Sequence, residues 1–207
     1  MFAIMRVAIF IDGGHIRVLA KASGFHYNPD FIEKVAHNCL GNDEELLRVL
    51  YYDCAPYIGS HKKPVSGDMQ EFKGSDGWLH ILAQKDLFAV RLGVLKFRGF
   101  KPISIPISEK LNDDDFKPDF EQKGVDMRIG LDIASYSASK AIDRIILVSG
   151  DTDCIPAMKH ARKAGLQIVL ITFPAHKIAS ELLEHADYRR EISWPKQDKK
   201  IVKKSKA

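Results

Sequence analysis

Four aspartates in three separate segments carry the chemistry that the sequence suggests. Asp12 ends the apolar run IFID and precedes two glycines. Asp151 and Asp153 follow the apolar run ILVSG, and Asp126 lies in the segment KGVDMRIG. Carboxylates that are brought together repel one another unless a cation lies between them, and oxygen ligands suit Mg²⁺. Together these residues predict an acidic metal site suited to hydrolysis of a phosphodiester bond.

Some of these acids also have a structural alternative. Asp153 falls where a helix N-cap is expected, with Pro156 in the first turn, so it could serve only to satisfy free backbone N–H groups. Asp126 is favoured near a helix N-terminus by the helix dipole. We expect a functional role for Asp12, because an acid that ends an apolar strand beside two glycines has little local structural purpose.

Other polar residues close to these acids are candidates for supporting roles. The hydroxyl groups of Ser149 and Thr152 flank the paired acids and could orient them through hydrogen bonds. Lys123 precedes Gly124 and could neutralise a scissile phosphate. Asp132 follows Asp126 by six residues, about 120° around a helix, so the two cannot face one metal ion.

The four acids can meet only if the strands before them are parallel. Runs rich in Val, Ile and Leu, several of them without alternation, are typical of strands that are covered on both faces. We predict such strands at residues 6–11, 46–52, 90–97, 144–149 and 166–171. Since ligand sites in open α/β sheets collect at the carboxyl ends of the strands, the acids should converge there.

Helical patterns alternate with these runs, which predicts right-handed crossovers and a mainly parallel α/β sheet. The expected helices cover residues 30–40, 76–88, 126–140, 154–164 and 177–190. Asn28-Pro29 should open the first helix and Gly165 should close the fourth. Residues 55–75 and 99–123 hold much of the Gly, Pro and charge, and we predict that they form long loops.

Length and composition place the chain among globular proteins of one domain. It has 207 residues, of which 45% are apolar and 28% charged, and no apolar run approaches the ~20 residues of a membrane-spanning helix. The opening segment reads as a strand, not as a signal peptide. Its three cysteines lack a CxxC pair, which argues against disulfides or a zinc cluster and favours a reducing cytoplasm.

The formal charge of +4 depends largely on six lysines in residues 196–207. A lysine-rich end attracts polyanions, but it is also typical of a solvated, flexible end, which is the interpretation that we favour. We therefore predict one domain over residues 1–190 and a basic, flexible tail over residues 191–207.

The segments IFIDGGHI, KGVDMRIGLDI and ILVSGDTDCIPAMKHARKAGLQIVL resemble, in order and spacing, the motifs of the NYN domain family. The resemblance is to the LabA-like branch of that family, within the PIN-like nuclease superfamily, and covers roughly residues 5–190. It implies a Rossmann-like α/β/α sandwich and a metal-dependent ribonuclease in which four acids hold Mg²⁺ or Mn²⁺: Asp12, Asp126, Asp151 and Asp153. Single-stranded or loop RNA would be the substrate, and a homodimer is possible.

One residue departs from the family pattern. The first motif of the family commonly reads Asp-Gly-x-Asn, whereas this chain has His15 in place of the amide. Histidine can form similar hydrogen bonds or coordinate Mn²⁺. Alternatively, it could cap the helix that follows. The sequence thus also permits a non-catalytic RNA-binding or regulatory module. A phosphatase of the haloacid dehalogenase kind is disfavoured, because Gly14 stands where its second aspartate would be.

Overall fold

Seven strands form the central sheet of the computed structural model, which describes residues 4–105 and 110–196. The strand order is β6-β5-β2-β1-β7-β8-β9, and all neighbours pair in parallel except β5 and β6. The bounds are β1 Met5–Asp12, β2 Glu44–Cys54, β5 Phe88–Pro102, β6 Phe116–Lys123, β7 Arg144–Val148, β8 Gln167–Thr172 and β9 Tyr188–Glu191. All five predicted strands are present.

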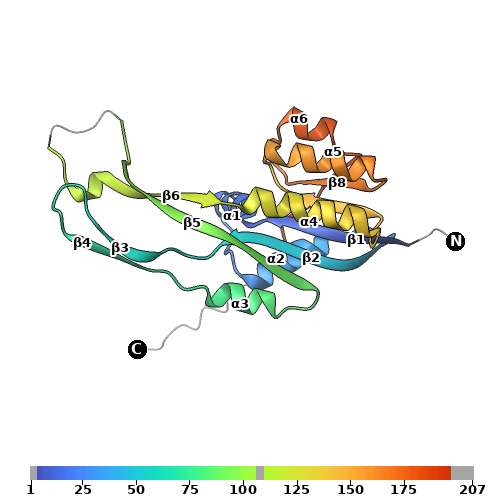
Figure 1. Cartoon of the computed structure of the whole chain (residues 1–207), viewed down its shortest axis with the longest axis horizontal. Helices are drawn as coiled ribbons and strands as arrows, with labels where there is room; N and C mark the ends of the chain where they lie inside the picture. The colour runs from blue at the N-terminus through green and yellow to red at the C-terminus, as the bar shows by residue number, and fades with distance from the viewer. Residues whose placement is uncertain (1–3, 106–109, 197–207) are drawn as a thin grey trace.

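Helices cover both faces of this sheet. The first set is α1 Gly13–Ala22, α2 Pro29–Asn38 and α3 Gly77–Ala83, and the second is α4 Val125–Ser139, α5 Ile155–Lys163 and α6 Ser180–Glu184. Ile9 and Ile11 of β1 pack with the first set, whereas Phe10 packs with the second. Figure 1 shows α4 and α5 on one side of the sheet and α2 and α3 on the other. The predicted three-layer α/β sandwich with a mainly parallel sheet is confirmed.

Local signals that the sequence carries set several helix ends. The Asn28 side chain accepts a hydrogen bond from the Phe31 N–H at 2.8 Å and caps α2, with Pro29 as its first residue. Gly165 follows α5 with φ +92°, a conformation that glycine adopts at little cost. No helix in the described part of the chain has the length and apolar character needed to span a bilayer.

Parts of the two segments predicted as long loops instead form the strands of an antiparallel arm, whereas residues 63–68, 103–105 and 110–112 belong to no strand or helix. Strands β3 (Ile58–Lys62) and β4 (Met69–Lys73) form a hairpin, and β5 continues past the sheet to pair with β6. We call β3, β4, β6 and the part of β5 from Val94 onward the arm. Figure 1 shows it projecting from the body of the molecule.

An aromatic cluster holds the two ribbons of the arm together, which explains why the loop prediction was wrong. The rings of His61 and Phe97 stack with centroids 3.9 Å apart, and the cluster also contains Tyr57, Phe72, Phe100 and Phe120. A β-bulge between Phe97 and Gly99 shifts the register of the β5–β6 ribbon, and Gly99 has φ +115°. Isolated hairpins are only marginally stable, so these strands depend on a non-local contact.

The prediction of a closing helix over 177–190 was largely wrong. Helix α6 has only five residues, and the chain then adds β9 to the edge of the sheet. The Asp187 side chain accepts a hydrogen bond from the Ile168 N–H at 2.8 Å, which fixes this turn to β8. The helix predicted over 76–88 likewise ends at Ala83, and Phe88 begins β5.

Packing continues beyond residue 190, into the segment predicted as a tail. Ile192 is buried, and Trp194 stacks on Phe173 with centroids 4.1 Å apart. Residues 197–207, which hold most of the terminal lysines, lie outside the described residues.

A buried ion-pair cluster joins strands at the edge of the sheet opposite the acids. The fully buried Glu44 side chain accepts two hydrogen bonds from Arg190, at 2.8 and 2.9 Å, and one from Arg144. Burial alone would raise the pKa of Glu44, but the bonds from Arg190, the Gly41 N–H and Arg144 lower it to about 2. The cluster thereby ties β2 to β7 and β9.

The lowered pKa predicts an acid-sensitive contribution to stability. The unfolded chain has the higher pKa for Glu44, so the contribution is complete above about pH 4.5 and is lost as the pH falls towards about 2. Glu44→Gln should lower the free energy of unfolding at pH 7 by about 3 kcal/mol and flatten its acid dependence. Urea unfolding between pH 2 and 7 measures both, with Glu45→Gln as the exposed control; an unchanged pH profile would contradict the prediction.

Candidate functional site

The carboxyl ends of two adjacent parallel strands bring the first acids together. Strands β1 and β7 pair in register up to Ile11 and Val148, so Asp12 and the segment after β7 emerge side by side. Asp126 lies in the first turn of α4, which packs against α5. The convergence expected from the sequence is therefore present at this edge of the sheet.

Three of the predicted acids form a compact cluster, which we call the acid cluster. Asp126, Asp151 and Asp153 each offer one carboxylate oxygen, and these oxygens lie within 4.8 Å of one another. Ligands of an octahedral Mg²⁺ at about 2.1 Å lie about 3 to 4.2 Å apart, so small side-chain rotations would suffice to bind the ion. Burial raises the pKa of Asp126, and the neighbouring charges of Asp151, Asp12 and Asp153 raise it further, so the ionised form of Asp126 is disfavoured at this position.

Asp12 lies beside the acid cluster rather than within it. Its carboxylate is buried and accepts the His15 N–H at 3.1 Å, and the Ser149 hydroxyl donates to it at 3.3 Å. Asp12 is therefore the N-cap of α1, and the expectation that it has little local structural purpose was wrong. Capping uses only part of its acceptor capacity, because a carboxylate has two oxygens with several lone pairs.

The capping role expected for Asp153 belongs to Asp151 instead. The Asp151 side chain accepts the Asp153 N–H at 2.9 Å and caps a 3₁₀ turn, η2 Thr152–Cys154. Helix α5 has Cys154 as its N-cap residue, and the Cys154 side chain accepts no hydrogen bond from the backbone N–H groups of the first turn. The Asp153 carboxylate is thus left to the acid cluster.

Ser149 connects the two strand ends, whereas Thr152 does not. The Ser149 hydroxyl is buried, donates to Asp12 and accepts the Asp151 N–H at 3.1 Å. Thr152 lies in η2 between the paired acids, and within the described structure its hydroxyl has no hydrogen bond to either of them. The buried Cys154 thiol lies next to Ser149, with its Sγ 3.8 Å from the Ser149 Oγ. Burial raises the pKa of this thiol to about 12.

His15 lies in the first turn of α1, with its ring against Gly150. A Cβ on Gly150 would be 2.6 Å from the imidazole, so only glycine leaves room for it. Burial is the main influence and lowers the pKa of His15, although the charges of Asp12 and Asp151 act in the opposite direction. The ring is therefore mostly neutral at pH 7, and the His15 backbone, not its ring, takes part in the helix cap.

Lys123 and Asp132 do not belong to the acid cluster. Lys123 ends β6, is about half exposed and pairs with Glu121. Asp132 accepts hydrogen bonds from the Tyr52 hydroxyl at 2.9 Å and from Arg91 at 3.1 Å, so it serves a separate network, as its position on the helix predicted.

Sequence reasoning missed two further polar groups at this edge. Asp53, buried at the end of β2, follows an apolar run just as Asp12 does, and that signal could have found it. Gln122 lies in the segment predicted as a loop. A Cβ on Gly14 would be 3.0 Å from Gln122 Oε1 and 3.3 Å from Asp12 Oδ1, so Gln122 reaches the immediate surroundings of Asp12.

Comparison with known proteins agrees with this architecture. The model of the NYN domain family matches residues 6–193. The chain belongs to the NYN domain family. NYN domains fall within the PIN-like nuclease superfamily, so the family supports a nuclease-type fold with an acidic edge.

A solved structure with a similar fold is the crystal structure of a protein of unknown function from Vibrio parahaemolyticus. It has 18% sequence identity and a TM-score of 0.53, and the match covers 93% of this chain and 95% of that one. At this identity the likeness concerns the fold alone. A search of curated proteins finds no match.

The crowded acids predict that divalent cations stabilise this NYN domain. At a concentration 100 times the dissociation constant, Mg²⁺ or Mn²⁺ adds about 2.7 kcal/mol, or about 5–10 °C in melting temperature for a domain of this size. Asp151→Asn should abolish this gain and, without metal, should raise the melting temperature slightly because it relieves repulsion. Differential scanning fluorimetry with Asp86→Asn as the control measures both; equal gains in wild type and Asp151→Asn would refute the metal site.

Proposed function

We propose that this NYN protein is a metal-dependent ribonuclease that hydrolyses phosphodiester bonds in single-stranded or loop RNA. The observation that carries the proposal is the acid cluster, with Asp12 beside it, at the carboxyl edge of the sheet. Membership in the NYN family supports the same reaction class. The LabA-like branch, a homodimer and a cytoplasmic location remain predictions from the sequence.

The four acids have complementary roles in this proposal. Asp126, Asp151 and Asp153 would hold Mg²⁺ or Mn²⁺, and buried Asp12 would add negative charge beside them. Such an ion supplies the positive charge that lowers the pKa of a water and stabilises an in-line displacement at phosphorus. The Ser149 hydroxyl keeps Asp12 and the Asp151 backbone at a fixed separation, because it bonds to both.

His15 and Lys123 would act on the substrate side. The mostly neutral His15 imidazole has one nitrogen that donates and one that accepts a hydrogen bond, so it can orient a water as an amide would. Lys123 can leave Glu121 and bind a phosphate oxygen at a small cost in free energy, since exposed ion pairs contribute little to stability.

The outer face of the β5–β6 ribbon offers a path for the RNA backbone. Cross-strand pairing places five basic residues and two acids on this face: Lys96, Arg98, Lys101, Lys117, Lys123, Asp119 and Glu121. Lys123 is the basic residue of this face that lies nearest to Asp126 in the chain, three residues before it. Phosphate contacts of this kind position a nucleic acid without reading its sequence.

The proposal predicts RNA cleavage that requires both metal and the acids. Wild-type protein should cut end-labelled single-stranded RNA with Mn²⁺ or Mg²⁺ and not with EDTA. The double variant Asp12→Asn, Asp151→Asn should be slower by at least about 100-fold, because it removes charge beside and within the acid cluster. Asp86→Asn serves as the control.

Other outcomes of this assay separate the alternatives. Full activity of the double variant would reject the proposed site. Phosphate release from small monoesters would favour a phosphatase. RNA retention without cleavage, unaffected by the double substitution, would favour a non-catalytic RNA-binding module, which the substitution of histidine for the family's amide makes the second candidate.

His15 provides a separate test of catalytic competence. If its ring takes the place of the family amide, His15→Asn should keep activity within about tenfold, whereas His15→Ala should lose about 10- to 100-fold in kcat, the scale typical of positioned hydrogen-bonding groups. Single-turnover cleavage of the same RNA measures this. A rise from no detectable cleavage to clear activity in His15→Asn would instead show that the natural chain is a non-catalytic module.

A further inference from the structure

A hollow lies at the base of the arm, and none of the acid-cluster residues lines it. This hollow, which we call the arm pocket, has a volume of about 460 Å³ and is lined by residues of α1, β4, β5 and β6, the carboxyl end of β2 and the start of α3. Pockets of this size are in the range that holds small organic ligands. The proposed hydrolysis itself assigns it no role.

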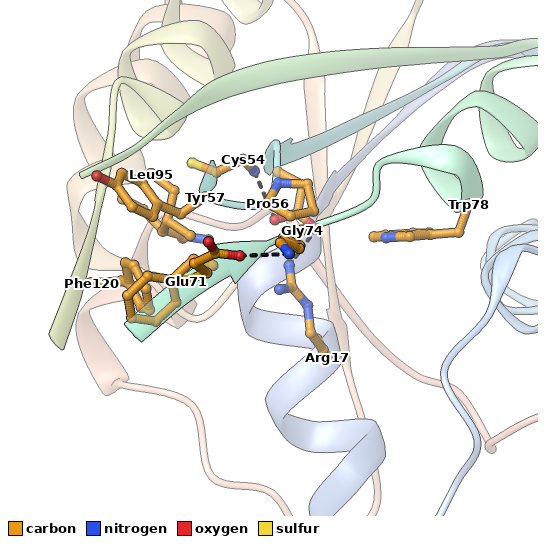
Figure 2. A pocket seen from close by; sticks show the side chains of 13 residues that line it. Arg17, Cys54, Pro56, Tyr57, Glu71, Gly74, Trp78, Leu95 and Phe120 are labelled. Carbon is orange, nitrogen blue, oxygen red and sulfur yellow. Dashed lines mark hydrogen bonds and ion pairs between the residues drawn. The ribbon is translucent and has the colours of Figure 1, made fainter. Parts of the chain in front are cut away.

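Aromatic rings form opposite walls of the arm pocket. Figure 2 shows Trp78 on one side, Tyr57 and Phe120 on the other, and Arg17 rising from α1 between them. The centroids of Tyr57 and Phe120 are 5.5 Å apart, and Phe72 lies 5.5 Å from Phe120, so this wall is already formed. Flat, sequence-tolerant ring surfaces are what unstacked nucleobases bind.

The floor of the arm pocket carries hydrogen-bonding groups that are held in place. Asp53 is 1% exposed and accepts bonds from the Tyr51 hydroxyl at 2.9 Å, the Cys54 N–H at 2.7 Å and Arg17. Arg17 is thus fixed by one nitrogen, while its buried Nε has no hydrogen-bond partner in the described structure. A buried donor without a partner is costly, and a ligand acceptor would relieve that cost.

The rim of the arm pocket adds groups of both polarities. Lys73 and Glu71 form an ion pair at its edge, and the Gln122 amide lines it as well. Nucleobase edges present adjacent donors and acceptors, so this mixed set suits a base better than it suits a purely anionic or purely apolar ligand.

One residue of the arm pocket, Gln122, also lies close to Asp12. Gln122 lines the pocket, and it also lies next to the Gly14 position that adjoins Asp12. A side chain at residue 14 would meet Gln122 and Asp12 Oδ1 at 3.0 and 3.3 Å. The absence of a side chain at residue 14 therefore leaves room for the Gln122 amide beside Asp12, so Gln122 adjoins both the arm pocket and the acidic edge.

We propose that the arm pocket binds one unpaired nucleotide of the RNA, adjacent to the scissile phosphate, with its base against the aromatic wall and its edge hydrogen-bonded by Arg17 and Gln122. The proposal rests on the proposed ribonuclease function. A base within a duplex would first have to unpair and unstack, which costs free energy, so the pocket would favour single-stranded or loop RNA.

Intrinsic fluorescence tests the pocket without any catalysis. The chain has two tryptophans, Trp78 in the arm pocket and Trp194 on the Phe173 side of the core. In Trp194→Phe, nucleoside monophosphates at millimolar concentration should quench or shift the emission of Trp78 saturably. In Trp78→Phe, the emission of Trp194 should not respond. No response of Trp78, or equal responses of both, would overturn the proposal.

Pocket variants then connect this response to RNA. Gln122→Leu and Lys73→Ala should weaken the binding of a single-stranded oligonucleotide to the Asp12→Asn, Asp151→Asn protein about tenfold, in the range of single base contacts. Asp86→Asn, a change at an exposed residue outside the pocket, should leave this binding unchanged. Unaltered binding in both pocket variants would overturn the proposal.

The two proposals can fail separately. Cleavage without any Trp78 response would keep the ribonuclease and reject the pocket. A saturable Trp78 response in a protein that never cleaves RNA would keep the pocket and reject the hydrolytic reaction.

Discussion

Mutual repulsion among carboxylates is the constraint on which the site depends. Parallel strands deliver Asp12 and the segment after β7 to one edge, and α4 adds Asp126. The fold holds these charges together, and burial together with the neighbouring carboxylates raises the pKa of Asp126. An arrangement that costs stability in the bare protein is typical of a functional site rather than a structural one.

Stability is supplied elsewhere, at the opposite edge of the sheet. There the Glu44 side chain is fully buried and accepts hydrogen bonds from two arginines, so that β2, β7 and β9 are joined where no ligand is expected. Of the strands that lead to the acids, β7 is thereby fixed at its start, through Arg144. The hydrogen bonds of Ser149 fix the acids locally in the same way.

The sequence predicted the central sheet and the convergence of the acids at its edge, because both follow from local signals. Val, Ile and Leu runs mark buried strands, and an acid directly after such a run marks a strand end. It did not predict α1, which begins with two glycines that are poor helix formers and relies on Asp12 as its cap. Nor did it predict β9, whose charged residues YRRE lack a strand pattern and are held partly by the bonds of Arg190 to Glu44.

The arm was missed for a related reason. Its strands are short or carry many charges, and the contact that stabilises them, such as His61 on Phe97, joins residues far apart in the chain. Gln122 and the arm pocket were missed with it, because their positions follow from the pairing of β5 with β6. Non-local packing of this kind leaves little trace in the periodicity of one segment.

The bulge at Gly99 has a consequence for how such a protein could diversify. Strand β5 is anchored in the body by its parallel pairing with β2, from Phe88 to Gly93. From Val94 onward it pairs with β6 instead, in the antiparallel direction. Because side chains alternate along a strand, gaining or losing one residue at the bulge would exchange the inner and outer side chains of β5 beyond it, while the part of β5 that pairs with β2 keeps its faces. Evolution could in this way change which side chains the arm presents to a ligand while the acidic edge of the sheet stays unchanged.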